Sequence, residues 1–430
     1  MRNKLLLSAA ILPICGITGE AQAAEAQKHP NIIMFLVDDM GWQDTSLPFW
    51  TQRTHYNDIY ETPNMERLAA QGMMFTQAYA CSVSSPSRVS LFTGMNAARH
   101  RVTSWTLHKN KTHEQPDSVL IYPEWNVNGI CQEPGIERTT QVTTLAQVLK
   151  ENGYYNLFFM THEGQYDNMN AFFRTNGYDE VFSQEDYPAD KVVNSFGVQD
   201  DFLYDYAIPV LNQRAATGEP FFATLLSISN HPPYVIPPFF HPKTSEPEMQ
   251  IVEYADWALR QFFEEARKQP WFDNTIFVLE GDHGKLVGDA ECELPESYNH
   301  IPLMIYSSRI QPEEKTTFGG QVDIQPTILG LLNIDYLQNN FGVDLLKEER
   351  PCMFYTADNM VVGRNDTLLY LYNYETQQEL TYDIGNGKLN AVPMDDSFLP
   401  LKEYSFSMLQ SAEFLVKHGK TLNSIPFTQQ

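Results

Sequence analysis

Four short apolar segments, each followed by an acidic residue or a histidine, constrain the fold of this chain more than any other feature. They cover residues 31–37, 154–160, 221–229 and 275–279. Segments of this length without polar alternation are typical of strands buried on both faces of a parallel sheet. Helical patterns occur between and after them, at residues 63–72, 87–94, 143–150, 254–268 and 323–332. This alternation predicts an α/β fold with a mostly parallel central sheet and helices on both faces.

Polar residues follow the four segments at the point where each predicted strand ends. They are Asp38 and Asp39, His162, His231, and Asp282 with His283. In an open parallel sheet, ligands bind beyond the C-terminal ends of the strands. We therefore expect these side chains to form one site.

The pattern changes near residue 352. Segments 368–374 and 379–384 have the pattern of antiparallel strands joined by turn residues, and 401–417 has the pattern of a helix. We predict a catalytic domain over residues 29–350. A small C-terminal subdomain, with an antiparallel sheet and a terminal helix, is predicted over 351–430.

The N-terminus has the pattern of an export signal. Arg2 and Lys4 precede a largely apolar stretch over residues 5–17, and a cleavage pattern ends at Ala23. The apolar stretch is too short to span a bilayer. We expect a signal peptide over residues 1–23 and a periplasmic or secreted protein. Cys15 gives a weak lipoprotein pattern, so membrane attachment is expected only if this residue is lipidated.

Composition limits the partners of the chain. The formal net charge is −25, so nucleic-acid phosphates would be repelled and no nucleic-acid partner is expected. An anionic substrate would need local cations, from a metal ion or from arginine and lysine, to reverse the field inside a site. Four cysteines remain after the N-terminal segment, without a zinc-binding spacing: Cys81, Cys131, Cys292 and Cys352. They are compatible with one or two disulfides and equally with free buried thiols.

Two pairs of adjacent residues suit a divalent metal ion. Asp38 and Asp39 follow the first apolar segment, and neighbouring carboxylates repel each other unless a cation lies beside them. Asp282 and His283 follow the fourth segment and form a second cluster far along the chain. Hard oxygen ligands favour Ca²⁺, Mg²⁺ or Mn²⁺. We predict that both pairs bind one metal ion; helix caps, a solvated turn and a buried structural histidine are the alternative interpretations.

The run Ser-Ser-Pro-Ser-Arg at residues 84–88 is the strongest local motif. Pro86 suits the first turn of a helix, where its missing N–H does no harm. Ser84 is therefore expected just before a helix N-terminus, whose free N–H groups and dipole favour an anion. Arg88 follows one turn later and would point at the same place. This combination suits nucleophilic attack on a tetrahedral oxyanion; the simpler interpretation is a serine cap with a surface arginine.

Together with residues 31–39 and 61–64, the run from Ser84 to Gly94 resembles the N-terminal third of formylglycine sulfatases. Their signature is Cys or Ser, any residue, Pro, a small residue, Arg and, further on, Thr-Gly. The resemblance implies an alkaline phosphatase/sulfatase-like fold and a Ser84 that a maturation enzyme oxidises to formylglycine. One hydroxyl of the hydrated aldehyde would attack sulfur, and the other would expel sulfate. Arg88 would support this residue. The implied metal, usually calcium, would be held by Asp38, Asp39, Asp282, His283 and the modified Ser84.

Further residues have roles implied by the same resemblance. His231, in the run His-Pro-Pro, is similar to a sulfatase histidine that binds the ester or protonates the leaving oxygen. Where sulfatases carry Gly-Lys-x-His, this chain has Met-Thr-His at residues 160–162, so the lysine is absent and His162 is a candidate to replace part of its role. Lys285 is expected either to meet the ester anion or to lie on the surface. His300 takes a place where sulfatases commonly have arginine, and is interpreted as structural. Residues 96–107 look closest to bacterial carbohydrate sulfatases, which implies a sulfated glycan or a small sulfate ester as substrate.

The chain from about residue 140 to 420 resembles lipoteichoic acid synthases more closely. These enzymes belong to the same alkaline phosphatase-like superfamily but transfer phosphoglycerol with a threonine nucleophile and manganese. The first alternative function is therefore a phosphoglycerol or phosphoethanolamine transferase, or a phosphodiesterase, with unmodified Ser84 and Mn²⁺ or Zn²⁺ on Asp38, Asp282 and His283. The second alternative is a glycan-binding relative with an impaired site. Candidate lining residues, chosen because they lie near the motifs in the sequence, are His55, Tyr56, Trp105, His108 and Trp125.

Overall fold

The computed structural model describes residues 29–50, 52–103, 105, 143–338, 340–357 and 359–417. The expected signal peptide, Cys15, Cys131, His108 and Trp125 lie outside these residues. Within them, no helix is both long enough and apolar enough to cross a membrane. The three described cysteines are free thiols: Cys81, Cys292 and Cys352. Export and lipidation stay predictions.

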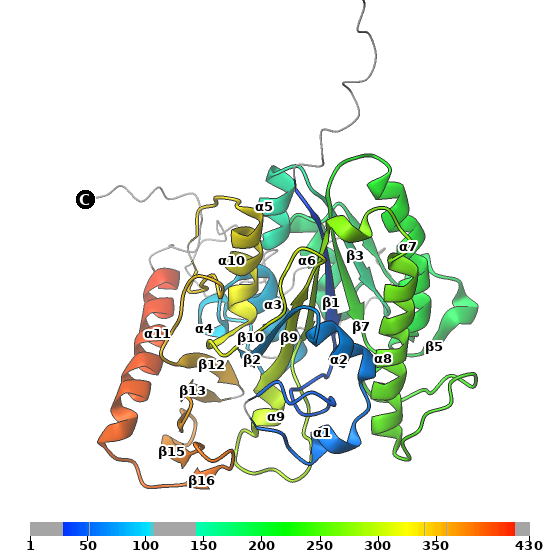
Figure 1. The fold of residues 1–430 in the computed structure, drawn as a ribbon. Coiled ribbons are helices and arrows are strands. Elements are labelled where there is room, and N and C mark those ends of the chain that lie inside the picture. Colours follow the sequence, from blue (N-terminus) through cyan, green and yellow to red (C-terminus); the bar gives the residue numbers. More distant parts are fainter. Residues whose placement is uncertain are drawn as a thin grey trace, which may run out of the picture.

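A nine-stranded sheet forms the centre of the molecule (Figure 1). Its strands are β1 (Asn31–Val37), β2 (Met73–Tyr79), β3 (Tyr155–Met160), β4 (Glu180–Phe182), β7 (Phe221–Ser227), β8 (Thr275–Gly281), β9 (His300–Tyr306), β10 (Glu313–Lys315) and β11 (Gly319–Gly320). Their order is β10-β2-β9-β8-β1-β7-β3-β4, with β11 paired to β2. Strand β9 runs antiparallel to both neighbours, and the other pairs are parallel. The predicted mostly parallel sheet is confirmed.

The four predicted apolar segments are the four adjacent strands β8, β1, β7 and β3. Every residue of β1, β7 and β8 is buried, which explains why their sequences lack polar alternation. The ends of three of these strands are tied together through the backbone. The Asp38 N–H donates to the Ser227 carbonyl oxygen, and the Asp282 N–H donates to the Val37 carbonyl oxygen, both at 3.0 Å. The residues that follow these strands therefore share one edge of the sheet.

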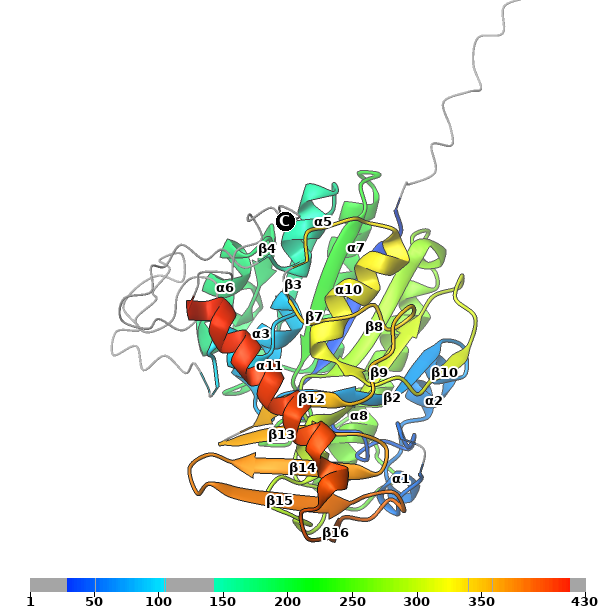
Figure 2. The same ribbon diagram turned by 90° about the vertical axis from the view of Figure 1, so that its left-hand side faces the viewer.

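Helices cover both faces of the sheet, as predicted (Figures 1 and 2). They are α1 (Tyr56–Ile59), α2 (Pro63–Ala69), α3 (Ser84–Thr93), α4 (Ala97–His100), α5 (Leu145–Glu151), α6 (Met169–Thr175), α7 (Asp200–Ala215), α8 (Pro247–Ala266), α9 (Glu296–Asn299) and α10 (Gln321–Leu332). Helices α2, α7 and α8 pack around Phe35 and Phe277 on one face. Helices α3, α5, α6 and α10 pack around Met34 and Phe158 on the other. The sheet is thus the middle layer of three.

The chain continues after the central sheet into a second, antiparallel sheet, as predicted. Its strands, in order, are β12 (Met353–Ala357), β13 (Met360–Arg364), β14 (Leu368–Asn373), β15 (Gln378–Asp383) and β16 (Asn390–Ala391). Helix α11 (Leu399–Lys417) packs across β13 and also touches α4 (Figure 2). A separate small hairpin consists of β5 (Val192–Asn194) and β6 (Gly197–Val198). The division at residue 350 stays a prediction.

Buried aromatic and ionic contacts fix the second sheet to the central one. Arg364 of β13 is fully buried, with Nη1 2.6 Å from Glu296 Oε1 and its guanidinium 4.8 Å from the centre of the Tyr79 ring. The Tyr79 ring also stacks on Tyr355 of β12, at 5.5 Å. Tyr79 also contacts His300, with ring centres 4.7 Å apart. His300 is therefore part of the packing, which agrees with its structural interpretation.

Candidate active site

The polar residues that follow the four central strands gather in one place, as predicted from the sequence. Asp38 follows β1, His162 follows β3, His231 follows β7, and Asp282 follows β8. Arg88 and the three histidines 162, 231 and 283 all act electrostatically on the Asp38 carboxylate. Burial disfavours the charged carboxylate, but Arg88 and the histidines outweigh it and lower the pKa of Asp38. An ionised aspartate thus lies at the centre of the site.

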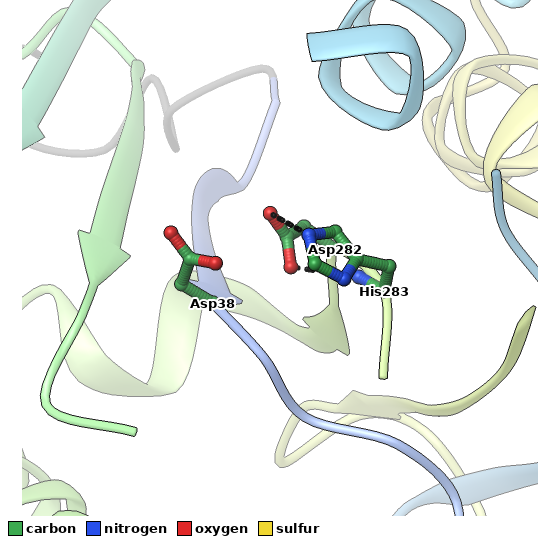
Figure 3. A group of neighbouring side chains, drawn as sticks. All are labelled: Asp38, Asp282 and His283. Carbon is green, nitrogen blue, oxygen red and sulfur yellow. Dashed lines mark hydrogen bonds and ion pairs between the residues drawn. The ribbon is translucent and has the colours of Figure 1, made fainter. Parts of the chain in front are cut away.

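Asp38, Asp282 and His283 form a compact buried group in which the two carboxylates lie near each other and the imidazole lies beside Asp282 (Figure 3). One potential ligand atom from each lies within 4.8 Å of the others. The Asp38 Oδ1 atom is buried and accepts no hydrogen bond from a described residue. Burial raises the pKa of Asp282 to about 6, and repulsion from the Asp38 carboxylate adds to this effect. This donor set fits a divalent cation. Asp39 stands outside the group, with Oδ1 3.6 Å from His283 Nδ1, and its role as a ligand stays a prediction.

Ser84 lies directly beside this group. It is the first residue of α3, one position further into the helix than predicted, and it is 8% exposed. The His283 Nδ1 atom lies 2.8 Å from the Gly284 carbonyl oxygen, so this nitrogen carries the proton. Nε2 of His283 can then accept the hydrogen bond from Ser84 Oγ, 3.0 Å away. The candidate nucleophile is therefore within hydrogen-bonding distance of a candidate metal ligand.

The remaining motif residues fix α3 at the end of β8. Pro86 lies in the first helical turn, as predicted, and Gly94 ends the helix with φ +64° in the left-handed region. The Ser87 hydroxyl donates to the Asp282 carbonyl oxygen. Nε2 of Gln321, on α10, donates to both of these oxygens at 2.6 Å. These hydrogen bonds explain the small hydroxyl residue of the motif at Ser87. No local sequence pattern predicts that Gln321 lies here.

Arg88 is buried among carboxylates, so the interpretation as a surface arginine is wrong. Its Nη2 atom lies 2.5 Å from Asp38 Oδ2 and 3.0 Å from Asp282 Oδ2, and Nη1 lies 3.7 Å from Asp167 Oδ2. Burial acts against the guanidinium charge, but these carboxylates outweigh it and raise the pKa of Arg88. Arg88 therefore balances the negative charge of the candidate metal group. Asp167 comes from the turn before α6 and was not identified from the sequence.

Two further histidines of the site differ in exposure. His162 is buried, and its Nδ1–H donates to the Glu163 carbonyl oxygen at 3.1 Å, while Nε2 has no hydrogen-bond partner among the described residues. Burial and the Arg88 charge lower the pKa of His162 to about 4. The lowered pKa favours the neutral imidazole, and the part of His162 in the role of the absent lysine stays a prediction. His231 is half-buried at the end of β7, with its ring 4.2 Å from Phe196, and its role at the leaving oxygen stays a prediction.

Lys285 lines a cavity beside the candidate metal ligands and does not lie on the outer surface. The cavity has a volume of about 480 Å³, and its lining includes Asp39, His283 and Trp105. Of the described candidate lining residues, only Trp105 takes part in it; His55 and Tyr56 do not. Tyr56 instead packs against a small cluster that contains Tyr60 and Val252 of α8.

Comparison with known proteins identifies the fold and the family. A family model described as Sulfatase matches residues 30–334, well over half of the chain. The chain belongs to the sulfatase family. A solved structure of a Vibrio parahaemolyticus protein, described as a member of the alkaline phosphatase superfamily, has a TM-score of 0.70 at 24% identity, over 91% of this chain and 88% of that one. The predicted fold class and family resemblance are confirmed.

Curated relatives of this sulfatase-family chain include both kinds of enzyme that the sequence suggested. Lipoteichoic acid synthase 1 of Bacillus subtilis (strain 168) is 25% identical over 261 residues, which are 56% of this chain and 39% of the synthase. A sulfatase of Formosa agariphila is 31% identical over 135 residues, which are 31% of this chain and 23% of that sulfatase. The chain thus matches less than half the length of each relative.

His100, in the short helix behind the sulfatase motif, predicts a dependence of stability on pH. It is fully buried; the Val102 N–H donates to Nδ1 at 3.1 Å, and Nε2–H donates to Ser90 Oγ at 2.9 Å. Burial lowers the pKa of His100 to about 3. Between pH 6.5 and 3 the unfolded chain therefore binds a proton that the folded protein does not, and stability falls as the pH falls.

Between pH 7 and pH 5, His100 should lower the unfolding free energy of the parent protein by about 2 kcal/mol, at about 1.4 kcal/mol per pH unit below 6.5. We expect the fall in unfolding free energy of His100→Gln to be smaller by this amount. Urea unfolding at both pH values measures this loss. An equally steep loss in parent and variant would show that His100 does not carry the effect.

Proposed function

We propose that this protein hydrolyses sulfate esters, on a sulfated glycan or a small sulfate ester, through a formylglycine made from Ser84. The observation that carries the proposal is the position of Ser84. It begins α3 with its Oγ 3.0 Å from His283 Nε2, within the motif that continues through Pro86, Arg88 and Gly94. A nucleophile at a helix start, beside a group of metal ligands, suits attack on an anionic tetrahedral centre.

The chemistry follows from Ser84 and the groups around it. Oxidation of Ser84 removes two hydrogens and leaves an aldehyde, whose hydrate offers two hydroxyl groups. One attacks sulfur as the alcohol leaves, and the other expels sulfate and restores the aldehyde. His231 is proposed to give a proton to the leaving oxygen. Arg88 keeps the Asp38 and Asp282 carboxylates ionised by balancing their charge.

A divalent cation, in the first instance Ca²⁺, is proposed to be held by Asp38, Asp282 and His283. Asp39 and the modified Ser84 are proposed as further ligands. When bound, such an ion would supply positive charge that polarises the ester. The buried Asp38 oxygen without a partner supports this assignment.

A second candidate function is phosphoglycerol or phosphoethanolamine transfer, or phosphodiester cleavage, by unmodified Ser84 with Mn²⁺ or Zn²⁺. Two observations favour it. Ser84 Oγ lies 3.0 Å from His283 Nε2, so an ion held by His283 would lie beside the hydroxyl group and favour its deprotonation. The similarity to lipoteichoic acid synthase 1 also covers 56% of this chain, against 31% for the Formosa sulfatase.

We further propose that the protein acts after export, in the periplasm or outside the cell, and that a formylglycine-generating enzyme matures it. Membrane attachment would require lipidation of Cys15. These proposals rest on the sequence of residues 1–23 and on the Ser84 motif.

Turnover assays distinguish the candidates. The protein would be produced together with a serine-type maturation enzyme, loaded with Ca²⁺ or Mn²⁺, and assayed on an aryl sulfate, on sulfated mono- and oligosaccharides and on an aryl phosphodiester. We expect release of inorganic sulfate. Phosphodiester cleavage with Mn²⁺, without sulfate release from any substrate, would replace the proposal by the second candidate. Binding of sulfated oligosaccharides without any turnover would point to a non-catalytic glycan-binding protein.

A further inference from the structure

The start of α7 holds the segment that carries His231 at two points. Gln199, the residue before α7, accepts a hydrogen bond from Ser229 Oγ at 3.3 Å through its Oε1 atom. Its Nε2 atom donates to the Val235 carbonyl oxygen at 2.8 Å. His231 lies between these two points in the chain. The backbone on either side of His231 is therefore tied to one helix end.

Asp200, the first residue of α7, fixes the end of β7. Its carboxylate is fully buried. The Ser227 hydroxyl donates to Oδ2 at 2.8 Å, and the N–H groups of Ile228 and Ser229 donate to Oδ1 at 3.2 Å. A turn follows, in which the His231 N–H donates to the Ile228 carbonyl oxygen at 2.9 Å. The position of the His231 backbone thus depends on Asp200.

The small hairpin of β5 and β6 holds the imidazole ring of His231. The ring of Phe196, between the two strands, has its centre 4.2 Å from that of His231. The hairpin packs on the end of β3, where the Val198 N–H donates to the Thr161 carbonyl oxygen at 3.1 Å. Gly197 has φ +88°, and a Cβ atom there would lie 1.7 Å from the same oxygen, so no side chain fits. A close backbone contact therefore places Phe196 against His231.

The hydrogen bond of one ring nitrogen of His231 sets the role of the other. Nδ1 lies 2.6 Å from the Pro232 carbonyl oxygen, which can only accept, so Nδ1 carries a proton. The proton that a charged imidazole can give to a ligand is then the one on Nε2. The ring acts electrostatically on the Asp38 and Asp39 carboxylates. Its orientation therefore decides whether Nε2 reaches an ester beside the candidate metal group.

We infer that Asp200 and Phe196 are positioning residues for His231: Asp200 fixes its backbone, and Phe196 fixes the orientation of its ring. The inference rests on the proposed function in that His231 protonates the leaving oxygen. As the bond from that oxygen to sulfur or phosphorus breaks, the bonding electron pair stays on the oxygen. The oxygen takes the Nε2 proton, and the imidazole becomes neutral. The competing explanation is that Asp200 only caps α7 and supports the fold.

The test compares kcat/KM for phenyl sulfate and 4-nitrophenyl sulfate, with the matured, Ca²⁺-loaded full-length protein. The two esters are similar in size, but 4-nitrophenol is the stronger acid. Its oxygen leaves without a proton, whereas the departure of phenol is faster when an acid protonates it. Variants are Asp200→Ala, Asp200→Asn, Phe196→Leu, His231→Gln, and the double variant of Asp200→Ala with His231→Gln.

Asp256→Ala is the matched control. Asp256 is also a buried aspartate, and its carboxylate accepts hydrogen bonds from the backbone N–H groups of Asn64 and Met65, at 2.8 and 2.9 Å. These contacts hold the start of α2, outside the candidate site. Phe196 is half-buried in its hairpin, so its variant should fold even if Asp200→Ala does not.

We expect Asp200→Ala to lower kcat/KM for phenyl sulfate about 10- to 100-fold, because displacement of a catalytic group by about 1 Å can cost about 100-fold. The loss for 4-nitrophenyl sulfate should stay under about 3-fold. Phe196→Leu should show the same preference with a smaller loss. Asp200→Asn should recover part of the rate, since its amide oxygen can still accept both backbone N–H groups.

The double variant separates positioning from a purely structural role. Once His231→Gln has removed the acid, Asp200→Ala should lower kcat/KM for phenyl sulfate by less than about 3-fold more, because the two residues act as a unit. Asp256→Ala should keep the parent's ratio between the two esters.

Equal losses on both esters in Asp200→Ala and Phe196→Leu would overturn the inference and leave Asp200 as a structural cap. Additive losses in the double variant would overturn it as well. If the parent cleaves only phosphodiesters, the sulfatase proposal fails. The inference then stands if the same pattern holds for methyl phenyl phosphate and methyl 4-nitrophenyl phosphate with Mn²⁺. A parent without turnover on either class of ester overturns both.

Discussion

Ser84→Ala is expected to lower turnover at least about a thousandfold while the protein stays folded. Removal of a nucleophile costs this much or more in enzymes with covalent catalysis, because binding and electrostatic groups alone rescue little of the rate. Among the described residues the hydroxyl makes one hydrogen bond, to His283 Nε2 at 3.0 Å. Its loss should therefore lower the unfolding free energy by only about 1 kcal/mol. Steady-state rates and urea unfolding measure the two effects separately.

The matched control is Ser90→Ala. Ser90 is also a buried serine of α3, and its Oγ lies 2.9 Å from a histidine Nε2 atom, that of His100. This variant loses an equivalent hydrogen bond outside the candidate site, so it should lose similar stability but keep turnover within a few-fold of the parent. Retention of more than about a tenth of the parent kcat by Ser84→Ala would rule out Ser84 as the nucleophile in both catalytic proposals.

Arg88→Met is expected to destabilise the metal-free protein by about 3–5 kcal/mol. The substitution leaves Asp38, Asp282 and Asp167 in a buried place without the guanidinium that now lies within 3.7 Å of each. Breaking a buried ion pair by removing one partner costs this much because an uncompensated charge stays inside. A divalent cation that binds only the folded state should restore part of the loss. Urea unfolding in a chelator and in excess Ca²⁺ gives both values.

Arg53→Met is the control for this experiment. Arg53 pairs with Asp58 at 2.6 Å, but both side chains are more than half exposed, so its loss should cost under about 1 kcal/mol and should not depend on Ca²⁺. If Arg88→Met unfolds in the chelator at the same urea concentration as the parent, the proposed balance of charges in the site is wrong.

The parts of the fold that were predicted are those that local patterns encode. The segments at β1, β3, β7 and β8 are largely apolar and lack polar alternation because both faces of those strands are buried. Since parallel strands end at one edge, the convergence of Asp38, His231 and Asp282 followed directly. Pro86 and Gly94 marked both ends of α3 for conformational reasons that hold in any context.

The parts that were missed depend on contacts between distant segments. Strand β9 inserts antiparallel between β2 and β8, and nothing within its own sequence specifies that direction. Helix α7 carries Pro209 in its interior and lacks a clear apolar stripe. Asp167, from the turn before α6, and Gln321, from α10, reach the site through tertiary packing alone. The neutral state of His162 likewise follows from burial and from Arg88, neither of which its sequence neighbours reveal.

The central claim, that Ser84 is converted to formylglycine, is tested most directly by a tryptic mass spectrum. Trypsin releases residues 68–88 as one peptide, since no lysine or arginine interrupts this stretch. In protein made with the maturation enzyme, we predict a peptide two hydrogens lighter than the encoded one, or its hydrate, with the change located at Ser84. A peptide that is entirely unmodified in that preparation would contradict the sulfatase proposal and would favour an unmodified Ser84 that acts on phosphodiesters.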